Sequence, residues 1–284
     1  MNVEYGGSAV EPLTQSARLE RLIGMLLAEL PDGGGFTLPD DDADRRDLLR
    51  ALVNVRPPMP APDGFLAVQD AYLRGERERA HDGAGVVDVC GLRPYRADEP
   101  DIVLWRGDIT RLRADAIVNA ANDAMLGCFR PNHHCIDNAI HTFAGIQLRA
   151  ECADVMNRLG RYARTAEPIL TDGWNLPAGH VIHVTGPVVE GPLTEEHRRL
   201  LADCYRNCLD LADAHGLRSV AFCSISTGVF GFPIEQAAPI AVATVRAFLR
   251  ERAERVGLAG CSPMTVVFDV FSDYDRSVYE QALR

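Results

Sequence analysis

The chain has 284 residues, 47% of them hydrophobic and 24% charged, and a formal charge of −11. This length and composition are enough for one large globular domain with an appendage. The acidic balance disfavours sequence-independent binding of nucleic acid, because basic side chains drive such binding. No apolar run reaches the roughly 18–20 residues of a membrane span, and the N-terminus lacks the pattern of a signal peptide. We therefore expect a cytoplasmic protein that requires neither nucleic acid nor a membrane.

The first part of the chain predicts a small helical unit. Leucine and isoleucine recur on one helical stripe through residues 16–30, and a proline follows. A short helix is expected at 47–53, after the acidic cap at 40–42, and a third at 64–80. No candidate catalytic cluster occurs here. We expect residues 1–85 to form a helical N-terminal extension that packs on the main domain or on a partner.

From residue 100 onward, short β-rich runs alternate with longer helical ones. Strands are expected within 101–110, 115–122, 179–187, 219–226 and 265–271. Helices are expected around 136–159, 195–215, 233–255 and 273–283. Several strands are apolar on consecutive residues, as in a sheet covered on both faces. Residues 86–284 are therefore predicted to form a three-layer α/β/α domain with a central mixed sheet, and its ligand site is expected at the carboxyl ends of the strands.

Two of the loops after predicted strands carry polar motifs. GDIT, at 107–110, follows the first strand, but Gly-Asp pairs are common in ordinary turns. NAAN places Asn119 and Asn122 three residues apart at the end of the next strand. Two carboxamides in this position can face one crevice and hydrogen-bond sugar hydroxyls, although asparagine also suits turns.

A third loop, STGVFGFP, lies between a strand and the helix expected at 233–255. Its glycines allow a tight turn with exposed backbone N–H groups, and the helix N-terminus adds partial positive charge. Such a loop can hold a diphosphate without lysine. It matches neither the Walker A pattern nor GxGxxG, which argues against a P-loop ATPase and a typical dinucleotide dehydrogenase.

The stretch GCFRPNHHCIDNAIH, at 127–141, concentrates cysteine and histidine. Cys128, His133 and Cys135 can converge on one metal ion, because the residues between them supply a turn, and zinc favours these donors. Three protein ligands with an open fourth position are typical of catalytic zinc. If His134 or His141 closed the shell, the zinc would instead be structural.

The other cysteines and histidines are predicted to be structural or inert: His180 and His183 beside a strand, Cys204 and Cys208 on one helical face, and the isolated Cys90, Cys223 and Cys261. In a reducing compartment, none of them is expected to form a disulfide.

Taken together, GDIT, NAAN, STGVFGFP and GCFRPNHHCIDNAIHTFAG resemble the macrodomain family, and within it the zinc-containing microbial branch. The resemblance covers residues 100–284, and the helical extension fits that branch as well. Each short motif is weak alone, whereas all four in this order are specific.

The resemblance implies an ADP-ribose crevice at the strand ends. Asp108 matches the aspartate that accepts a hydrogen bond from the adenine amino group, and Ile109 matches a residue at the diphosphate. Asn119 and Asn122 match asparagines at the distal ribose. The diphosphate loop is matched by Ser226, Thr227, Gly228, Val229, Phe230 and Gly231.

The resemblance also implies a metal and an activity. Zn2+ would be held by Cys128, His133 and Cys135 beside the distal ribose, whereas His134 and His141 match no ligand. The branch removes mono-ADP-ribose from modified protein side chains, and some members act beside sirtuin-type ADP-ribosyltransferases. The chain is therefore expected to be a hydrolase. The alternatives are an O-acetyl-ADP-ribose deacetylase and a non-catalytic reader of ADP-ribosylated proteins with structural zinc.

A chemical hypothesis follows for an ester between ribose and an Asp or Glu side chain. Zinc would orient or activate the attacking water while Asn122 fixes the distal ribose. Asp137 would either support a ligand or cap the helix that starts there. The segment GCFRPNHHC stands where many zinc-free hydrolytic macrodomains carry a glycine-rich stretch, so their catalytic account is not transferred.

Overall fold

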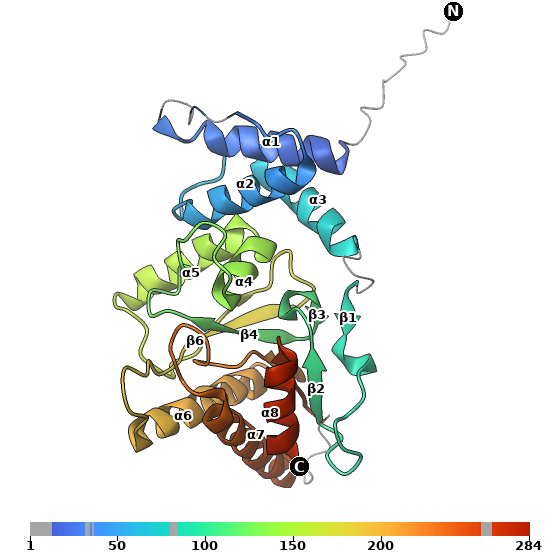
Figure 1. Cartoon of the computed structure of the whole chain (residues 1–284), viewed down its shortest axis with the longest axis vertical. Helices are drawn as coiled ribbons and strands as arrows, with labels where there is room; N and C mark the ends of the chain where they lie inside the picture. The colour runs from blue at the N-terminus through green and yellow to red at the C-terminus, as the bar shows by residue number, and fades with distance from the viewer. Residues whose placement is uncertain (1–12, 32–34, 36, 80–84, 257–262) are drawn as a thin grey trace, which may run out of the picture.

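The computed structural model describes residues 13–31, 35, 37–79, 85–256 and 263–284. Three helices come first, and a mixed sheet flanked by five further helices follows (Figure 1). Cys261 lies outside the described residues, so its predicted inertness stays a prediction.

The N-terminal helices are α1 (Gln15–Leu27), α2 (Asp42–Val55) and α3 (Phe65–Glu78). Helix α2 begins earlier than expected because the Asp41 carboxylate accepts from two backbone N–H groups of its first turn. The three helices pack around a small apolar core of their own. Its buried members are Leu19, Leu22, Ile23, Leu26, Leu49, Leu52, Phe65, Tyr72 and Leu73.

The main sheet has six strands in the order β2-β8-β7-β4-β6-β5. Their bounds are β2 Ile102–Arg106, β4 Ala116–Ala121, β5 Ile169–Asp172, β6 His180–Thr185, β7 Ser219–Phe222 and β8 Thr265–Val270. Only β5 runs antiparallel to its neighbour, so the sheet is mixed and the predicted fold class is confirmed. β1 (Val87–Asp88) and β3 (Leu112–Arg113) form a separate parallel pair. These two short strands and β5 were not expected, since runs of two to four residues leave no periodicity to read.

Helices cover both faces of the sheet. α4 (Ile136–Ala144) and α5 (Ile146–Leu159) lie on the side of the N-terminal helices, whereas α6 (Glu195–Ala214), α7 (Ile234–Val256) and α8 (Asp273–Leu283) lie on the other (Figure 1). None of the described helices is both long and apolar enough to cross a membrane. The prediction that Cys204 and Cys208 belong to the core is confirmed, because both are fully buried on α6.

The single helix expected over 136–159 is two helices. The helical conformation is interrupted at Gly145, whose φ of 92° lies in the region that favours glycine. A Cβ at this position would also lie 2.5 Å from Gln69 Nε2 of α3. The break thus turns the chain and lets the N-terminal helices approach closely.

Gly145→Ala should therefore destabilise the fold. We expect the free energy of unfolding in urea to fall by about 1–3 kcal/mol, because alanine is strained at this φ and its methyl group meets Gln69. Gly24→Ala is the matched control, since Gly24 lies in α1 and no atom is found within 4 Å of the place its Cβ would take. It should be neutral or stabilising by up to about 1 kcal/mol. Equal effects of the two substitutions would contradict this account of the break.

Candidate active site

The GDIT motif follows β2 and begins a short 3-10 helix. Asp108 caps this helix, since its Oδ1 accepts from the backbone N–H and the hydroxyl of Thr110 at 3.0 and 2.6 Å. Gly107 N donates to Val270 O at the end of β8, so the two strand ends lie together. Asp269 lies beneath them, and burial together with the charge of Asp108 raises the pKa of its carboxyl well above the usual range. The motif therefore presents the half-buried carboxylate of Asp108 close to a buried carboxyl group whose pKa is raised.

The two asparagines of NAAN have different surroundings. Asn119 is fully buried on β4, and its Nδ2 donates to Asp137 Oδ1 at 2.8 Å and faces His183 Nδ1 at 3.1 Å. Asn122 is half-buried at the end of the strand. Its Nδ2 donates to Gly127 O and its Oδ1 accepts from Ala124 N, both at 3.0 Å. Asn119 thus hydrogen-bonds to side chains in the protein interior, whereas Asn122 hydrogen-bonds to the backbone of the loop that follows β4. Contact of either asparagine with a ribose stays a prediction.

The loop after β7 is tightly folded. Phe232 N donates to Ser226 O, and Ser226 itself has a φ of 66°. A Cβ on Gly186, at the end of β6, would lie 2.0 Å from Ser226 Oγ, so the two segments touch. Gly228 is exposed, and Val229 is 74% exposed. Among the described residues, no oxygen accepts from the N–H groups of 228–230, which leaves them available to an anion.

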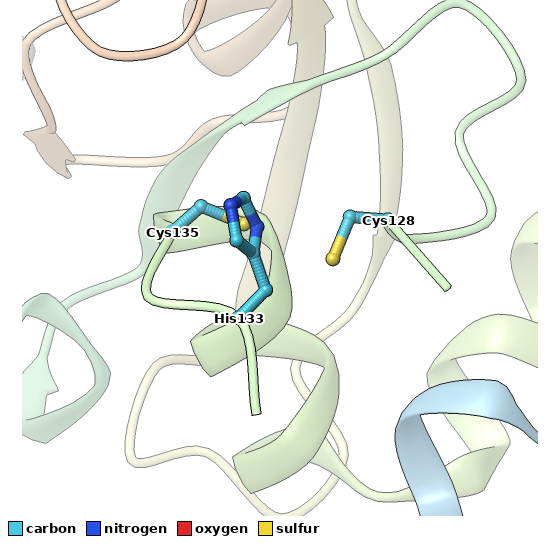
Figure 2. A group of neighbouring side chains, drawn as sticks. All are labelled: Cys128, His133 and Cys135. Carbon is cyan, nitrogen blue, oxygen red and sulfur yellow. The ribbon is translucent and has the colours of Figure 1, made fainter. Parts of the chain in front are cut away.

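Cys128, His133 and Cys135 converge beside this edge, as the sequence predicted. One donor atom from each lies within 4.8 Å of the others, and all three residues are half-buried (Figure 2). We call residues 126–135, which contain them, the Cys/His loop. Cys135 is also the N-cap of α4, and its sulfur accepts from Asn138 N at 3.4 Å.

The donor atoms of Cys128, His133 and Cys135 suit a metal ion. Burial chiefly, and the neighbouring Cys128, raise the pKa of the Cys135 thiol to about 12. A cation of high charge would lower it again, because thiolates are the form that binds metal. His133 Nδ1 is buried without a hydrogen-bond partner among the described residues. Two sulfurs and one imidazole nitrogen are donors that zinc prefers, so the residues fit this ion.

A second group, His141, Cys152 and His183, could also hold a metal, but it is fully buried. Both ring nitrogens of His183 already have neighbours, Asn119 at one and Thr171 Oγ1 at the other, 2.9 Å away. Burial lowers the pKa of His183 to about 3, so its ring is neutral. Coordination here would sacrifice the hydrogen bonds of His183, although both ring nitrogens of His141 lack a hydrogen-bond partner among the described residues. The structure thus brings together two groups of donors that could hold a metal, of which the half-buried trio in the Cys/His loop is the one expected from the sequence.

Asp137 and His134 complete the stretch. Asp137 does not cap α4, since Cys135 does; its buried carboxylate accepts from Asn119 instead. Burial chiefly raises the pKa of Asp137 to about 6. His134 is exposed and belongs to neither group of donors.

One residue at the same edge was not singled out from the sequence. Phe271 follows β8 directly and is 85% exposed, next to the Gly107–Val270 contact. A large aromatic ring exposed at a strand end offers a stacking surface. The signal in the sequence was its place immediately after an apolar strand.

A cavity of about 250 Å³ lies where the N-terminal helices meet the sheet domain. Arg50 of α2 and Tyr72 of α3 border it on one side, and Asp108 and Phe143 on the other. No residue of the Cys/His loop or of the loop 226–231 lines it. It therefore adjoins the strand-end site through the GDIT motif, at Asp108 and Thr110.

Comparison with known proteins places this architecture. The model of the Macro domain family matches residues 118–241. A protein-ADP-ribose hydrolase of Treponema medium is 45% identical over 272 residues, which are 95% of this chain and 100% of that protein. A probable bifunctional ADP-ribose hydrolase/ADP-ribosyltransferase of Fusarium oxysporum is 35% identical over 93% of this chain and 48% of that longer protein.

Among solved structures, a Trypanosoma brucei macrodomain in complex with ADP-ribose is 32% identical, with a TM-score of 0.61. The match covers 83% of this chain and 95% of that one. The fold is thus that of an α/β domain with polar loops at the carboxyl ends of its parallel strands. The chain belongs to the macro domain family.

Proposed function

We propose that this protein is a zinc-dependent hydrolase that removes mono-ADP-ribose from modified protein side chains linked through Asp or Glu. One observation carries the proposal. The Cys128, His133 and Cys135 trio follows β4 at the strand edge that also presents the anion loop 226–231. The support from comparison is the 45% identity to a protein-ADP-ribose hydrolase along nearly the whole chain.

The nucleotide would lie along this edge. Asp108 would accept from the adenine amino group, and Phe271 would stack on the ring. Ile109 would lie near the diphosphate, which the N–H groups of the loop 226–231 would hold at the N-terminus of α7. This order leaves the distal ribose at Asn122 and the Cys/His loop.

The chain's own residues would then arrange hydrolysis at the distal ribose. Cys128, His133 and Cys135 would hold the zinc, which supplies Lewis acidity at the sugar when bound. Asn122 would orient the ribose. The hydroxyl of a water would bond to the anomeric carbon as the bond to the carboxyl oxygen breaks, and the freed side chain would leave as a carboxylate with release of a proton.

The same crevice would accept O-acetyl-ADP-ribose, and a reader module would bind without turnover. Metal-loaded protein is therefore incubated with a carboxylate-linked mono-ADP-ribosylated protein and, separately, with O-acetyl-ADP-ribose, and release is followed by mass spectrometry. We expect release from the modified protein. Turnover of the small ester alone would favour the deacetylase, and stable binding without turnover of either would favour the reader. A sirtuin-type ADP-ribosyltransferase would be the partner that supplies the substrate.

Each of the three metal ligands should be needed for zinc binding. Cys135→Ala should remove the bound zinc and lower turnover by about 100-fold or more, since it deletes a ligand rather than an outer contact. Metal content is measured together with the rate. Cys90→Ala is the control, because Cys90 is an exposed cysteine outside the metal group. A folded, zinc-free Cys135→Ala protein with full activity would show that the metal is dispensable.

The anion loop 226–231 should be needed for ADP-ribose binding. Gly228→Glu should weaken ADP-ribose binding by about tenfold or more, because a carboxylate would face the diphosphate. Calorimetry gives the affinity. Gly228→Gln is the matched control of equal size without charge, and no atom lies within 4 Å of a Cβ at this position. If both variants bound like the wild type, the diphosphate would lie elsewhere.

The aromatic ring of Phe271 should contribute to ADP-ribose affinity. Phe271→Ala should weaken ADP-ribose binding by about 1–3 kcal/mol, roughly 5- to 150-fold in Kd. Trp174→Ala is the control, because Trp174 is also an exposed aromatic residue but lies between β5 and β6, at the opposite edge of the sheet. Equal affinities of Phe271→Ala and the wild type would place the adenine away from β8.

A further inference from the structure

The Cys/His loop lacks regular secondary structure and adopts unfavourable backbone conformations. Phe129 and Asn132 have φ values of 47° and 52°, and Met125 just before the loop has 60°. A non-glycine residue in this region costs about 1–3 kcal/mol and persists only where its surroundings hold it. The trio therefore depends on contacts from outside the loop.

Helix α2 supplies such contacts, although it lies more than seventy residues earlier in the chain. Arg50 donates through Nε and Nη2 to Asn138 Oδ1, at 3.1 and 2.8 Å, and through Nη2 to His133 O at 3.3 Å. One turn later, Asn54 Oδ1 accepts from Asn132 N at 3.0 Å. Asn54 is 1% exposed, so this bond is shielded from water.

Asn138 links Arg50 to the sulfur atoms of Cys128 and Cys135. Its Nδ2 donates to Cys128 Sγ at 3.5 Å and to Arg130 O at 3.1 Å, and its backbone N donates to Cys135 Sγ at 3.4 Å. A guanidinium bound to the carbonyl oxygen of an amide polarises that amide and strengthens its N–H donors. Arg50 therefore both fixes the Asn138 side chain and favours negative charge on Cys128 Sγ, the sulfur that this side chain contacts.

A second arginine ties the other end of the loop to the same helix. Arg149 of α5 is buried; its Nε donates to Leu126 O at 2.8 Å, and its Nη1 donates to Val53 O at 2.8 Å. The guanidinium also lies 4.5 Å from the centre of the Phe129 ring. Both ends of the loop are thus linked to residues of α2.

We infer that Arg50 is a positioning residue for the metal site: through Asn138 and His133 it holds the donor atoms of the Cys/His loop in binding geometry. The N-terminal helices are then part of the metal site rather than a separate appendage. This inference rests on the metal-binding part of the proposed function.

The test measures zinc affinity by competition with a chromophoric chelator in the full-length chain. Arg50→Met should weaken zinc binding by about 10- to 100-fold, the usual effect of removing an outer contact to metal ligands. Arg50→Lys should recover part of the affinity, because an ammonium can reach one acceptor but cannot fork between two. ADP-ribose affinity, whose adenine and diphosphate contacts are placed at Asp108, Phe271 and the loop 226–231, should change far less than zinc affinity in both variants.

Arg46→Met is the matched control. Arg46 lies one turn earlier on α2, and in the described part of the chain it hydrogen-bonds to no atom of the Cys/His loop. Its zinc affinity should equal that of the wild type. Wild-type zinc affinity in a folded Arg50→Met protein would overturn the inference; if that variant does not fold, unchanged affinity in Arg50→Lys would do so. A wild-type chain that binds no zinc would overturn the metal-binding proposal as well, so the two failures are distinguishable.

Discussion

The parallel pairing of β4 with β6 on one side and β7 on the other is the constraint on which the site depends. The register sets Ala121 opposite Thr185 and Val118 opposite Phe222, so the three strands end at one edge. Parallel strands need long crossover connections, and these bring α5, α6 and α7 over the faces of the sheet. The loops that leave the edge are consequently brought together from segments a hundred residues apart.

Beneath the edge lies a layer of buried polar side chains that never reaches the surface. A chain of hydrogen bonds runs from Asp137 of α4 to Asn119 of β4, from there to His183 of β6, and on to Thr171 of β5. Each is at most 4% exposed, and unpaired polar groups at such depth would be costly. The layer therefore fixes α4 against the sheet. Because Cys135 begins α4, the position of this sulfur follows from interactions on the far side of the helix.

Alternating strand and helix patterns were enough to predict the fold class, and the spacing of Cys128, His133 and Cys135 was enough to predict their convergence. Both depend on short-range order in the chain. The contacts of Arg50 with His133 and Asn138, and of Arg149 with Val53, do not, since they join residues 83 to 96 positions apart and arise only when two packed units meet. Likewise, NAAN indicated two equivalent asparagines, but the alternation of side chains along a strand turned Asn119 inward. Gly145 within an otherwise helical run gave no sign that it breaks the helix, because the residues on both sides favour helix.

The bonds from α2 to the Cys/His loop also limit how this site can be transferred. A macro domain given only residues 126–135 would acquire three donor atoms but neither the guanidinium nor the carboxamide that fixes the loop from outside. Its strained residues would relax to ordinary backbone angles, and the donors would separate. The portable unit therefore includes α2, with the helices that bury its apolar face, and the two halves of the site must be inherited or engineered together.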